Sequence, residues 1–236
     1  MAYRWEWDVF LRDTGGGETY LQWMLSAWGW TLAVAALAWL LALSFGSCVG
    51  TLRTVPSRTL GSLARLWIEV FRNIPLLVQL FLWYHVIPAF IPPLKEVPSF
   101  VLAVFALGLF SSARVAEQLR AGIESLARGQ GHAGLALGLS LAQTYRFVLL
   151  PMAFRIVIPP LTSEAMNIIK NSSVAFAVSV SELTLFAMQA QEETSRGIEI
   201  YLAVTVLYVA SAFSVNRFMA WIETRVRVPG YIGSAS

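Results

Sequence analysis

The amino-acid sequence predicts an all-α integral membrane protein with about five transmembrane helices. Hydrophobic residues make up 57% of its 236 residues and charged residues only 13%, which lies far from the composition of soluble domains. The apolar residues gather in runs of about 20, the length that a helix needs to cross a hydrocarbon core of roughly 30 Å. The nine tryptophans suit the aromatic belts found at membrane interfaces.

The first span is the most clearly marked of the five. No charged residue occurs between Glu18 and Arg53, and the apolar centre of this interval reads TLAVAALAWLLALSFGSCV. Tryptophans near its start are placed to lie at one interface. Residues 1–22 include acids and no short apolar stretch with a cleavage site, so we expect them to form an N-terminal segment outside the membrane.

Four further spans follow, and several carry polar residues or prolines. They run from Leu60 to about Pro88, from Pro98 to about Glu117, from Leu161 to Val180 and from Ile200 to about Trp221. Pro159 and Pro160 are expected to break the chain before the fourth span. Because a charge at bilayer depth costs on the order of 3 kcal/mol, ionisable residues in these spans should face a bundle interior. We therefore predict one transmembrane domain over residues 23–223 and a tail over 224–236.

The cations orient the chain in the membrane. Of the 17 Lys and Arg residues, those on the N-terminal side are Arg4, Arg12, Lys95 and Arg196. Those on the opposite side are Arg53, Arg58, Arg65, Arg120, Arg128, Arg146, Arg217, Arg225 and Arg227. The others, Arg72, Arg114, Arg155 and Lys170, fall in or near the membrane. Because cytoplasmic loops are rich in cations, the N-terminus should lie outside and the C-terminus in the cytoplasm.

A polar stretch from Arg128 to Pro151 lies between apolar segments on the predicted cytoplasmic side. It combines cations with small residues and leucines at helical spacing. This pattern is typical of a short helix that presses into a groove of a partner protein. The composition also allows a second interpretation, an ordinary cytoplasmic loop with one amphipathic turn.

Motifs for catalysis or for holding a nucleotide are absent from the sequence. Neither lysine, Lys95 nor Lys170, follows a glycine, so there is no P-loop. His85 and His132 form no zinc-binding H-E-x-x-H pattern, and Cys48 stands alone. The G-x-S-x-G motif of serine hydrolases is missing as well. We therefore expect neither an enzyme nor a resident metal or cofactor.

The fourth span carries a polar stripe on one helical face. Its members are Glu164, Asn167, Lys170 and Asn171. A cavity lined by this stripe would hold a zwitterionic or anionic solute, with Lys170 near a carboxylate and Glu164 near an ammonium group. In the competing interpretation, Glu164 pairs with Arg114 or Arg155 inside the bundle and the stripe only stabilises packing.

Two more polar groups allow two interpretations each. Arg114 and Glu117, three residues apart, form either a gate or an ion pair with each other. Pro75 follows Asn73 closely in the second span, where it either frees a backbone carbonyl to line a cavity or simply kinks the helix.

The spacing of one cytoplasmic motif resembles a known signature. Permeases of binding-protein-dependent importers of the ATP-binding cassette (ABC) class carry an EAA core, a Gly four residues after its second Ala, and an I-x-L-P ending after nine more residues. This chain has the same spacing in His132, Ala133 and Gly134, then Gly138, then the run from Val148 to Pro151. The signature's Glu is replaced by His132 and its second Ala by Gly134.

Other runs resemble the polar amino-acid branch of that family, and within it the glutamate/aspartate importer permeases most. They include FRNIPLLVQLFLWY at 71–84, KNSS at 170–173 and TRVRVPG at 224–230. The resemblance implies a multi-pass permease of a bacterial inner membrane with a periplasmic N-terminus. It implies as partners a second permease subunit, identical or different, a periplasmic binding protein and two cytoplasmic ATPases that hold ATP and Mg. Lipid surrounds such a protein, and nucleic acid has no part in it.

The resemblance also implies two sets of functional residues. A coupling helix within about 120–151 would dock on the ATPase through Arg128, Gln130, His132, Ala133, Gly134, Leu137 and Gly138. An amino acid would bind near mid-membrane among Asn73, Gln79, Arg114, Glu117, Glu164, Asn167, Lys170, Asn171 and Ser172. With the signature's acid lost, either His132 or Arg128 would supply the polar contact to the ATPase.

Two other functions remain open at this point. One is an ion-coupled secondary amino-acid carrier in which Glu164 or Glu117 takes the coupling ion. The other is a membrane scaffold whose cytoplasmic helix recruits a partner without transport. Dependence on ATP separates the carrier from the importer, and replacement of Lys170 by Ala, which should impair an importer but not a scaffold, separates the scaffold from the importer.

Overall fold

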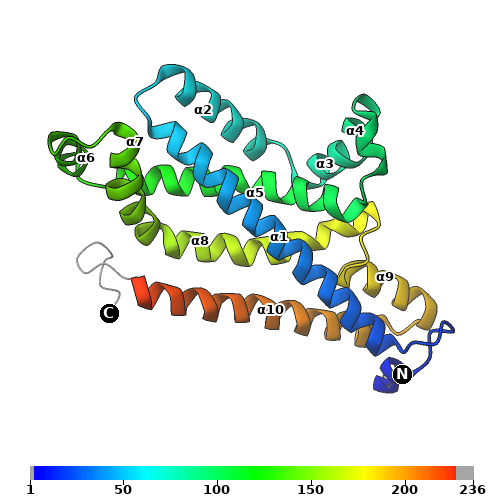
Figure 1. Ribbon diagram of the computed structural model, residues 1–236. Coiled ribbons are helices and arrows are strands. Elements are labelled where there is room, and N and C mark those ends of the chain that lie inside the picture. The colour runs from blue at the N-terminus through cyan, green and yellow to red at the C-terminus, as the bar shows by residue number, and fades with distance from the viewer. Residues whose placement is uncertain (1–2, 227–236) are drawn as a thin grey trace. The chain divides into compact units, whose positions relative to one another are not determined.

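A computed structural model describes residues 3–226, apart from the side chain of Arg128, and every regular element in this range is helical (Figure 1). The α-helices are α1 (Tyr20–Thr54), α2 (Arg58–Asn73), α3 (Leu76–Phe81), α4 (Ile87–Phe90), α5 (Ser99–Glu124), α6 (Arg128–Ala136), α7 (Leu141–Thr144), α8 (Leu150–Ser172), α9 (Leu183–Thr194) and α10 (Gly197–Val226). The prediction of an all-α fold is confirmed.

The candidate spans number four, or up to five if a bent pair counts as one. The four are α1, α5, α10 and the stretch Leu141–Val178 that contains α8. The bent pair joins α2 to Leu76–Phe90 at an angle of 105°. The bend falls at Ile74, whose φ of −95° and ψ of 128° are extended because Pro75 follows it. The predicted second span is therefore sharply bent at its proline.

The break predicted at Pro159 and Pro160 is wrong, because α8 continues as a helix through both residues. A proline inside a helix removes a backbone hydrogen bond but need not end the helix. Helices in membranes tolerate it because unwinding would expose more polar backbone groups to an apolar environment. A second difference is that the loop expected over 181–199 contains the helix α9.

The chain forms two compact units, each assembled from three separate segments. The first unit consists of Met1–Ala38, Pro75–Leu107 and Asn167–Ser214, and the second of Trp39–Ile74, Gly108–Met166 and Val215–Ser236. The single domain expected over 23–223 and the tail over 224–236 stay predictions, and residues 227–236 of that tail lie outside the described range.

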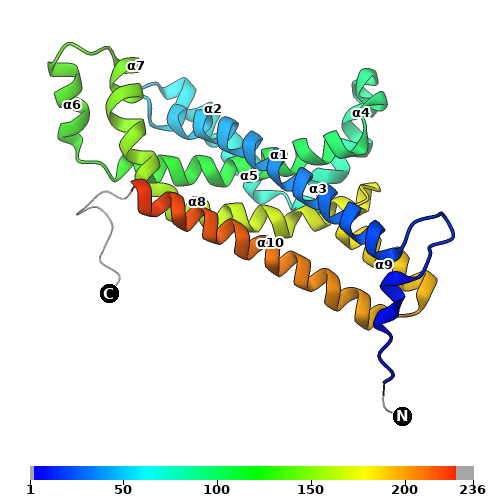
Figure 2. The same ribbon diagram turned by 60° about the horizontal axis from the view of Figure 1, so that its bottom comes forward.

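The core of the first unit packs α9 beside the beginnings of α1 and α10 (Figures 1 and 2). Its buried residues are Tyr20, Met24, Ala27, Leu183, Phe186, Ala187, Ala190, Ile200 and Val204. Hydrogen bonds satisfy the polar groups at its border: Trp28 Nε1 donates to Ser211 Oγ over 2.8 Å, and the Leu183 amide donates to Thr31 Oγ1 over 3.0 Å.

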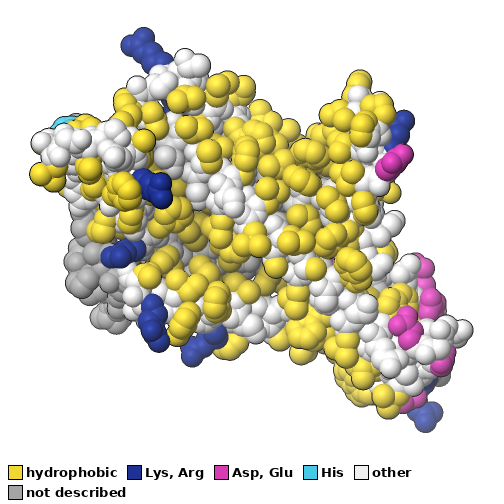
Figure 3. Space-filling model, viewed as in Figure 1, with side chains coloured by type: hydrophobic (Ala, Val, Ile, Leu, Met, Phe, Trp, Pro, Cys, Tyr) yellow, Lys and Arg dark blue, Asp and Glu magenta, His cyan; other side chains and the backbone are white. Residues whose placement is uncertain are grey.

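The N-terminal segment is fastened to the start of α10. The buried Glu199 accepts hydrogen bonds from the Tyr3 hydroxyl and, over 2.9 Å, from the amide of Glu6. Arg196 adds an ion pair with the Glu6 carboxylate. On the face that Figure 3 shows, acidic side chains of this unit gather over α9 and the N-terminal segment. Residues far apart in sequence thus form one polar network.

A buried carboxylate fixes the start of α9. Glu182 is fully buried and accepts hydrogen bonds from the amides of Thr184 and Leu185, over 2.9 and 3.0 Å, and from the Tyr208 hydroxyl over 2.7 Å. The two amides belong to the otherwise unsatisfied N–H groups of the helix start. Burial raises the pKa of Glu182 above its usual range, while the same hydrogen bonds oppose this shift.

We expect Glu182→Ala to lower the stability of the protein by about 2 kcal/mol. The substitution removes the helix cap and leaves the buried donors that Glu182 serves without an acceptor. Glu182→Gln should cost less, since its amide oxygen can still accept. Folding raises the pKa of Glu182, so protonation of this group stabilises the folded state. That contribution to stability is complete at pH values below the ordinary Glu pKa and is lost as the pH rises through the raised pKa of the folded protein. Glu182→Gln should remove that pH dependence.

Thermal unfolding in detergent at pH values on both sides of the Glu range measures these effects. The matched control is Glu192→Ala, at an exposed position of the same helix, where little change is expected. Equal losses at positions 182 and 192 would contradict the capping role.

In the second unit, α1 approaches α5 unusually closely because glycines face the contact. A Cβ atom built on Gly46 would lie 2.6 Å from the Ser112 carbonyl oxygen, and one on Gly50 would lie 2.5 Å from that of Ala116. Small residues spaced four apart allow this approach in membrane helices. α2 joins the same core, where the Trp67 indole donates to Ser112 Oγ over 3.2 Å.

Candidate functional site

The polar stretch that follows α5 folds into two short helices joined by a tight turn. α6 ends in a Schellman motif, in which the Gly138 amide donates to Leu135 O over 3.0 Å and the Leu139 amide to Gly134 O over 3.1 Å. Gly138 has a φ of +82°, a conformation that side chains with a Cβ atom rarely adopt. The glycine of the signature-like motif thus lies at a helix end that needs one.

The second short helix, α7, starts with a capping box between Ser140 and Gln143. α6 and α7 lie side by side (Figure 2) and touch where a Cβ atom on the buried Gly134 would come within 3.0 Å of Thr144. The Tyr145 hydroxyl bonds Thr54 Oγ1 over 3.2 Å, which ties this region to the end of α1. The stretch is therefore an ordered helical pair and not an irregular loop.

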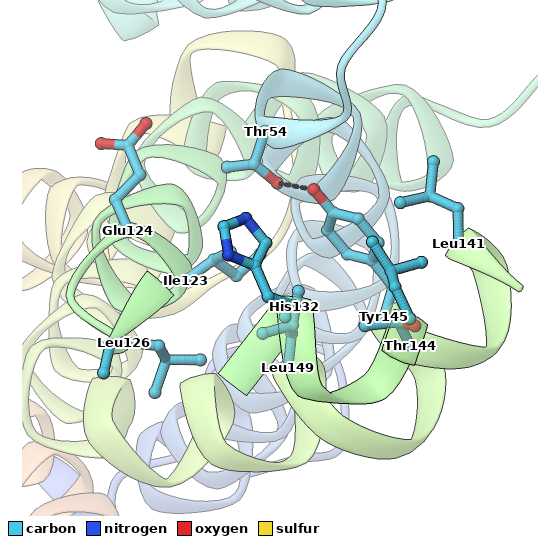
Figure 4. A pocket seen from close by; sticks show the side chains of 12 residues that line it. Thr54, Ile123, Glu124, Leu126, His132, Leu141, Thr144, Tyr145 and Leu149 are labelled. Carbon is cyan, nitrogen blue, oxygen red and sulfur yellow. Dashed lines mark hydrogen bonds between the residues drawn. The ribbon is translucent and has the colours of Figure 1, made fainter. Parts of the chain in front are cut away.

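A cavity of about 610 Å³ lies between α6 and the ends of α1 and α5 (Figure 4). The His132 side chain points into it, among Thr54, Ile123, Glu124 and Tyr145. The imidazole therefore faces the cavity inside this unit, although the sequence suggests His132 as a contact to a partner. The sequence could not predict the direction of the His132 side chain, because it depends on how the nine-residue helix α6 is rotated about its axis.

The residues predicted for ATPase docking differ in exposure. His132, Ala133, Leu137 and Gly138 are exposed, Gln130 is half-buried, Gly134 is buried, and the side chain of Arg128 lies outside the described residues. Leu137 is the most exposed of the leucines here, at 82%, and Leu135 is 47% exposed. Leu135 lines the same cavity as His132, and sequence reasoning did not single it out, although its apolar side chain at helical spacing from the motif was a visible signal.

An ion pair joins α5 to α8 in the second unit. Arg114 Nη1 lies 3.8 Å from Glu164 Oε1, and the Glu164 side chain is only 3% exposed. The Arg114 guanidinium also lies 4.2 Å from the centre of the Phe110 ring. Of the two partners that the sequence suggests for Glu164, the structure selects Arg114. A carboxylate buried this deeply needs such a partner.

Glu117 does not pair with Arg114. It lies 3.1 Å from Arg120 Nη2 and 3.8 Å from Arg72 Nη1, so it connects the end of α5 to the end of α2. Asn73 is exposed, and its side-chain amide donates to the Glu69 carbonyl of its own helix over 2.7 Å. Sequence reasoning missed Arg120 as a partner of Glu117, although the spacing of three residues was available.

The remaining residues predicted for substrate binding belong to the first unit. Gln79 and Ser172 are buried, Asn167 and Asn171 are half-buried, and Lys170 is exposed. The Ser172 hydroxyl donates to Ile169 O over 2.7 Å and so serves its own helix. The helix of Gln79, α3, packs against the 3₁₀ segment Ser173–Val178 that follows α8. Asn73, Arg114, Glu117 and Glu164 all belong to the second unit.

Among residues 3–226, no group of three His, Cys, Asp or Glu side chains is arranged to hold a metal ion.

Comparison with known proteins gives a consistent result. Residues 40–228 match the family described as "Binding-protein-dependent transport system inner membrane component". The glutamate/aspartate import permease protein GltJ of Escherichia coli K12 is 41% identical over 99% of both chains. The glutamine transport system permease protein GlnP of the same strain is 32% identical over 84% of this chain and 90% of its own. A crystal structure of an amino acid ABC transporter with histidines has a TM-score of 0.76 at 30% identity, covering 87% of this chain and 95% of the other.

Proposed function

This chain belongs to the family of binding-protein-dependent transport system inner membrane components, and from this premise we propose that it is the permease of an ATP-driven glutamate and aspartate importer. The substrate assignment rests on the 41% identity, over 99% of both chains, to a glutamate/aspartate import permease. The glutamine permease compared above is less similar, at 32% identity.

In this proposal the chain works within a larger complex. A second permease subunit completes the membrane part, a periplasmic binding protein delivers the amino acid, and two cytoplasmic ATPases hold ATP and Mg. The chain itself holds no nucleotide motif. Its N-terminus is periplasmic and its C-terminus cytoplasmic, in line with the distribution of its cations.

The coupling helix in this proposal is α6. Its end presents Leu137, which is 82% exposed, to the outside within a polar stretch, and an exposed leucine of this kind suits a groove on a partner, whereas Leu135 lines the same cavity as His132. Because His132 points into the cavity of its own unit, we assign the contact with the ATPase to the leucine end of α6. The Schellman turn at Gly138 holds this end in a fixed direction.

Arg114 is the side chain that we propose for a substrate carboxylate in the second unit. Its own side chain remains 40% exposed, while its partner Glu164 is covered. A guanidinium has several donors in one plane, so it can bind a second carboxylate without releasing the first. In the first unit, Lys170 is the exposed cation proposed for the same chemistry.

The proposal is tested by uptake of radiolabelled glutamate, aspartate and glutamine into liposomes that hold the purified complex, with ATP inside and the binding protein outside. We expect uptake of glutamate and aspartate only when ATP is present. Uptake of glutamine alone would contradict the proposed glutamate and aspartate specificity but would remain consistent with an amino-acid importer. Uptake driven by an ion gradient without ATP would contradict the importer.

A further inference from the structure

The turn between α1 and α2 gathers three arginines around one hollow. Arg53 lies in the last turn of α1, Arg58 and Arg65 lie on α2, and all three line a hollow of about 440 Å³. None of the three forms an ion pair with any residue in the described range. Positive charges held in one concavity repel one another, and an anion bound among them relieves that repulsion.

The hollow also borders the beginning of α2. Ser57 caps this 16-residue helix by accepting a hydrogen bond from the Leu60 amide, and Ser57, Gly61 and Ser62 belong to the lining. The N-terminal end of a helix carries a partial positive charge. It therefore adds to the field of the arginines, and the serine hydroxyls offer donors to an anion.

The surface of α2 next to the arginines is apolar and uncovered. Leu63 and Leu66 are 60% and 59% exposed, whereas Ala64 and Ile68 are buried against the unit. Since successive residues turn by about 100° around a helix, Leu66 lies about 100° from Arg65. Going around α2, the packed edge carries Ala64 and Ile68, the leucine edge carries Leu63 and Leu66, and the edge between them is cationic at the start of the helix. This cationic edge carries Arg58 and Arg65, and the exposed Glu69 follows on it one turn later.

We propose that this hollow binds the phosphate of an anionic phospholipid headgroup, with the acyl chains lying along Leu63 and Leu66. The cationic edge matches the charge of the phosphate, and the neighbouring leucine edge matches the chains. A free phosphate would satisfy the arginines but leave the leucines exposed. Membership in a family of inner membrane components places the chain among phospholipids, and the inference depends neither on which amino acid is transported nor on α6.

The test is thermal unfolding of the purified complex in detergent, titrated with phosphatidylglycerol, phosphatidylcholine or inorganic phosphate. We expect phosphatidylglycerol alone to raise the melting temperature. In the double variant Arg58→Gln/Arg65→Gln, the apparent affinity for phosphatidylglycerol should fall by at least about tenfold. The matched control is Arg217→Gln/Arg225→Gln on α10, which removes the same charge and should keep the wild-type response.

Three outcomes would overturn the inference. The first is an unchanged response of the position 58 and 65 variant, and the second is an equal loss in the α10 control. The third is a response to inorganic phosphate or phosphatidylcholine as large as that to phosphatidylglycerol, which would identify a free anion or general lipid solvation.

The leucine edge is tested separately with Leu63→Ser/Leu66→Ser. This variant should weaken the response to phosphatidylglycerol while the complex stays intact in size-exclusion chromatography. Dissociation of the complex would instead mean that a protein partner covers these leucines, and would overturn their assignment to acyl chains.

Discussion

Gly50→Leu is expected to abolish the accumulation of folded protein. A Cβ atom at this position would lie 2.5 Å from the carbonyl oxygen of Ala116 and 3.0 Å from its Cα atom. These atoms belong to the backbone of α5, so no flexible side chain can move aside. Extra bulk in a packed core typically costs about 1–3 kcal/mol, and a clash with a backbone falls at the upper end or beyond. The contact between Gly46 and Ser112 would open with it.

Size-exclusion chromatography of the detergent-solubilised protein measures this effect. The matched control is Gly29→Leu on the same helix, since a Cβ atom at Gly29 meets nothing within 4 Å in this chain. The control should elute as a single peak like the wild type. A monodisperse peak of normal height for Gly50→Leu would contradict the close approach of α1 to α5.

Leu137→Asp should stop ATP-driven uptake while the chain still folds. The side chain is 82% exposed and follows the last turn of α6, so its loss costs the isolated chain little. If it fills a groove on the ATPase, a carboxylate there must lose its water without a partner. We expect uptake to fall by at least about tenfold and the ATPase to be lost on copurification.

Leu11→Asp is the matched control for this prediction. Leu11 is 71% exposed, in the N-terminal 3₁₀ segment Trp7–Leu11, on the side predicted to be periplasmic. It should retain both uptake and ATPase. Wild-type uptake by Leu137→Asp would show that the leucine end of α6 is not the docking contact.

The sequence was sufficient for the long helices because composition and length determine them. The uncharged interval from Glu18 to Arg53 corresponds closely to α1, Tyr20–Thr54. The sequence was insufficient at the two prolines of α8, because packing before and after them outweighs the tendency of proline to break a helix. Ala153 and Val157 before them and Leu161 after them are all buried, so the helix gains more by continuing than by breaking.

The helix α9 was missed although its sequence contained a signal. Leu183, Phe186, Ala187 and Ala190 recur at helical spacing, and all are buried. The sequence analysis left these residues as the connection between the fourth and fifth spans. Glu182 was missed for a different reason, since the burial of an acid outside a span depends on tertiary packing.

The candidate site was predictable in composition but not in pairing. Spacing identified His132 and Gly138 and narrowed the partner of Glu164 to two arginines. The choice of Arg114, the link from Glu117 to Arg72 and the inward direction of His132 depend on how α2, α5, α6 and α8 rotate about their axes. A periodic pattern gives the face of a helix but not the neighbour that it meets.

The fastening of the N-terminal segment has a consequence for biosynthesis. Tyr3 and Glu6 are translated well over 100 residues before their partners Arg196 and Glu199. The segment can therefore be fastened only after the start of α10 has been made. A tag or fusion at the N-terminus would therefore hinder the late formation of these contacts between the N-terminal segment and α10, whereas the same addition at the C-terminus would not.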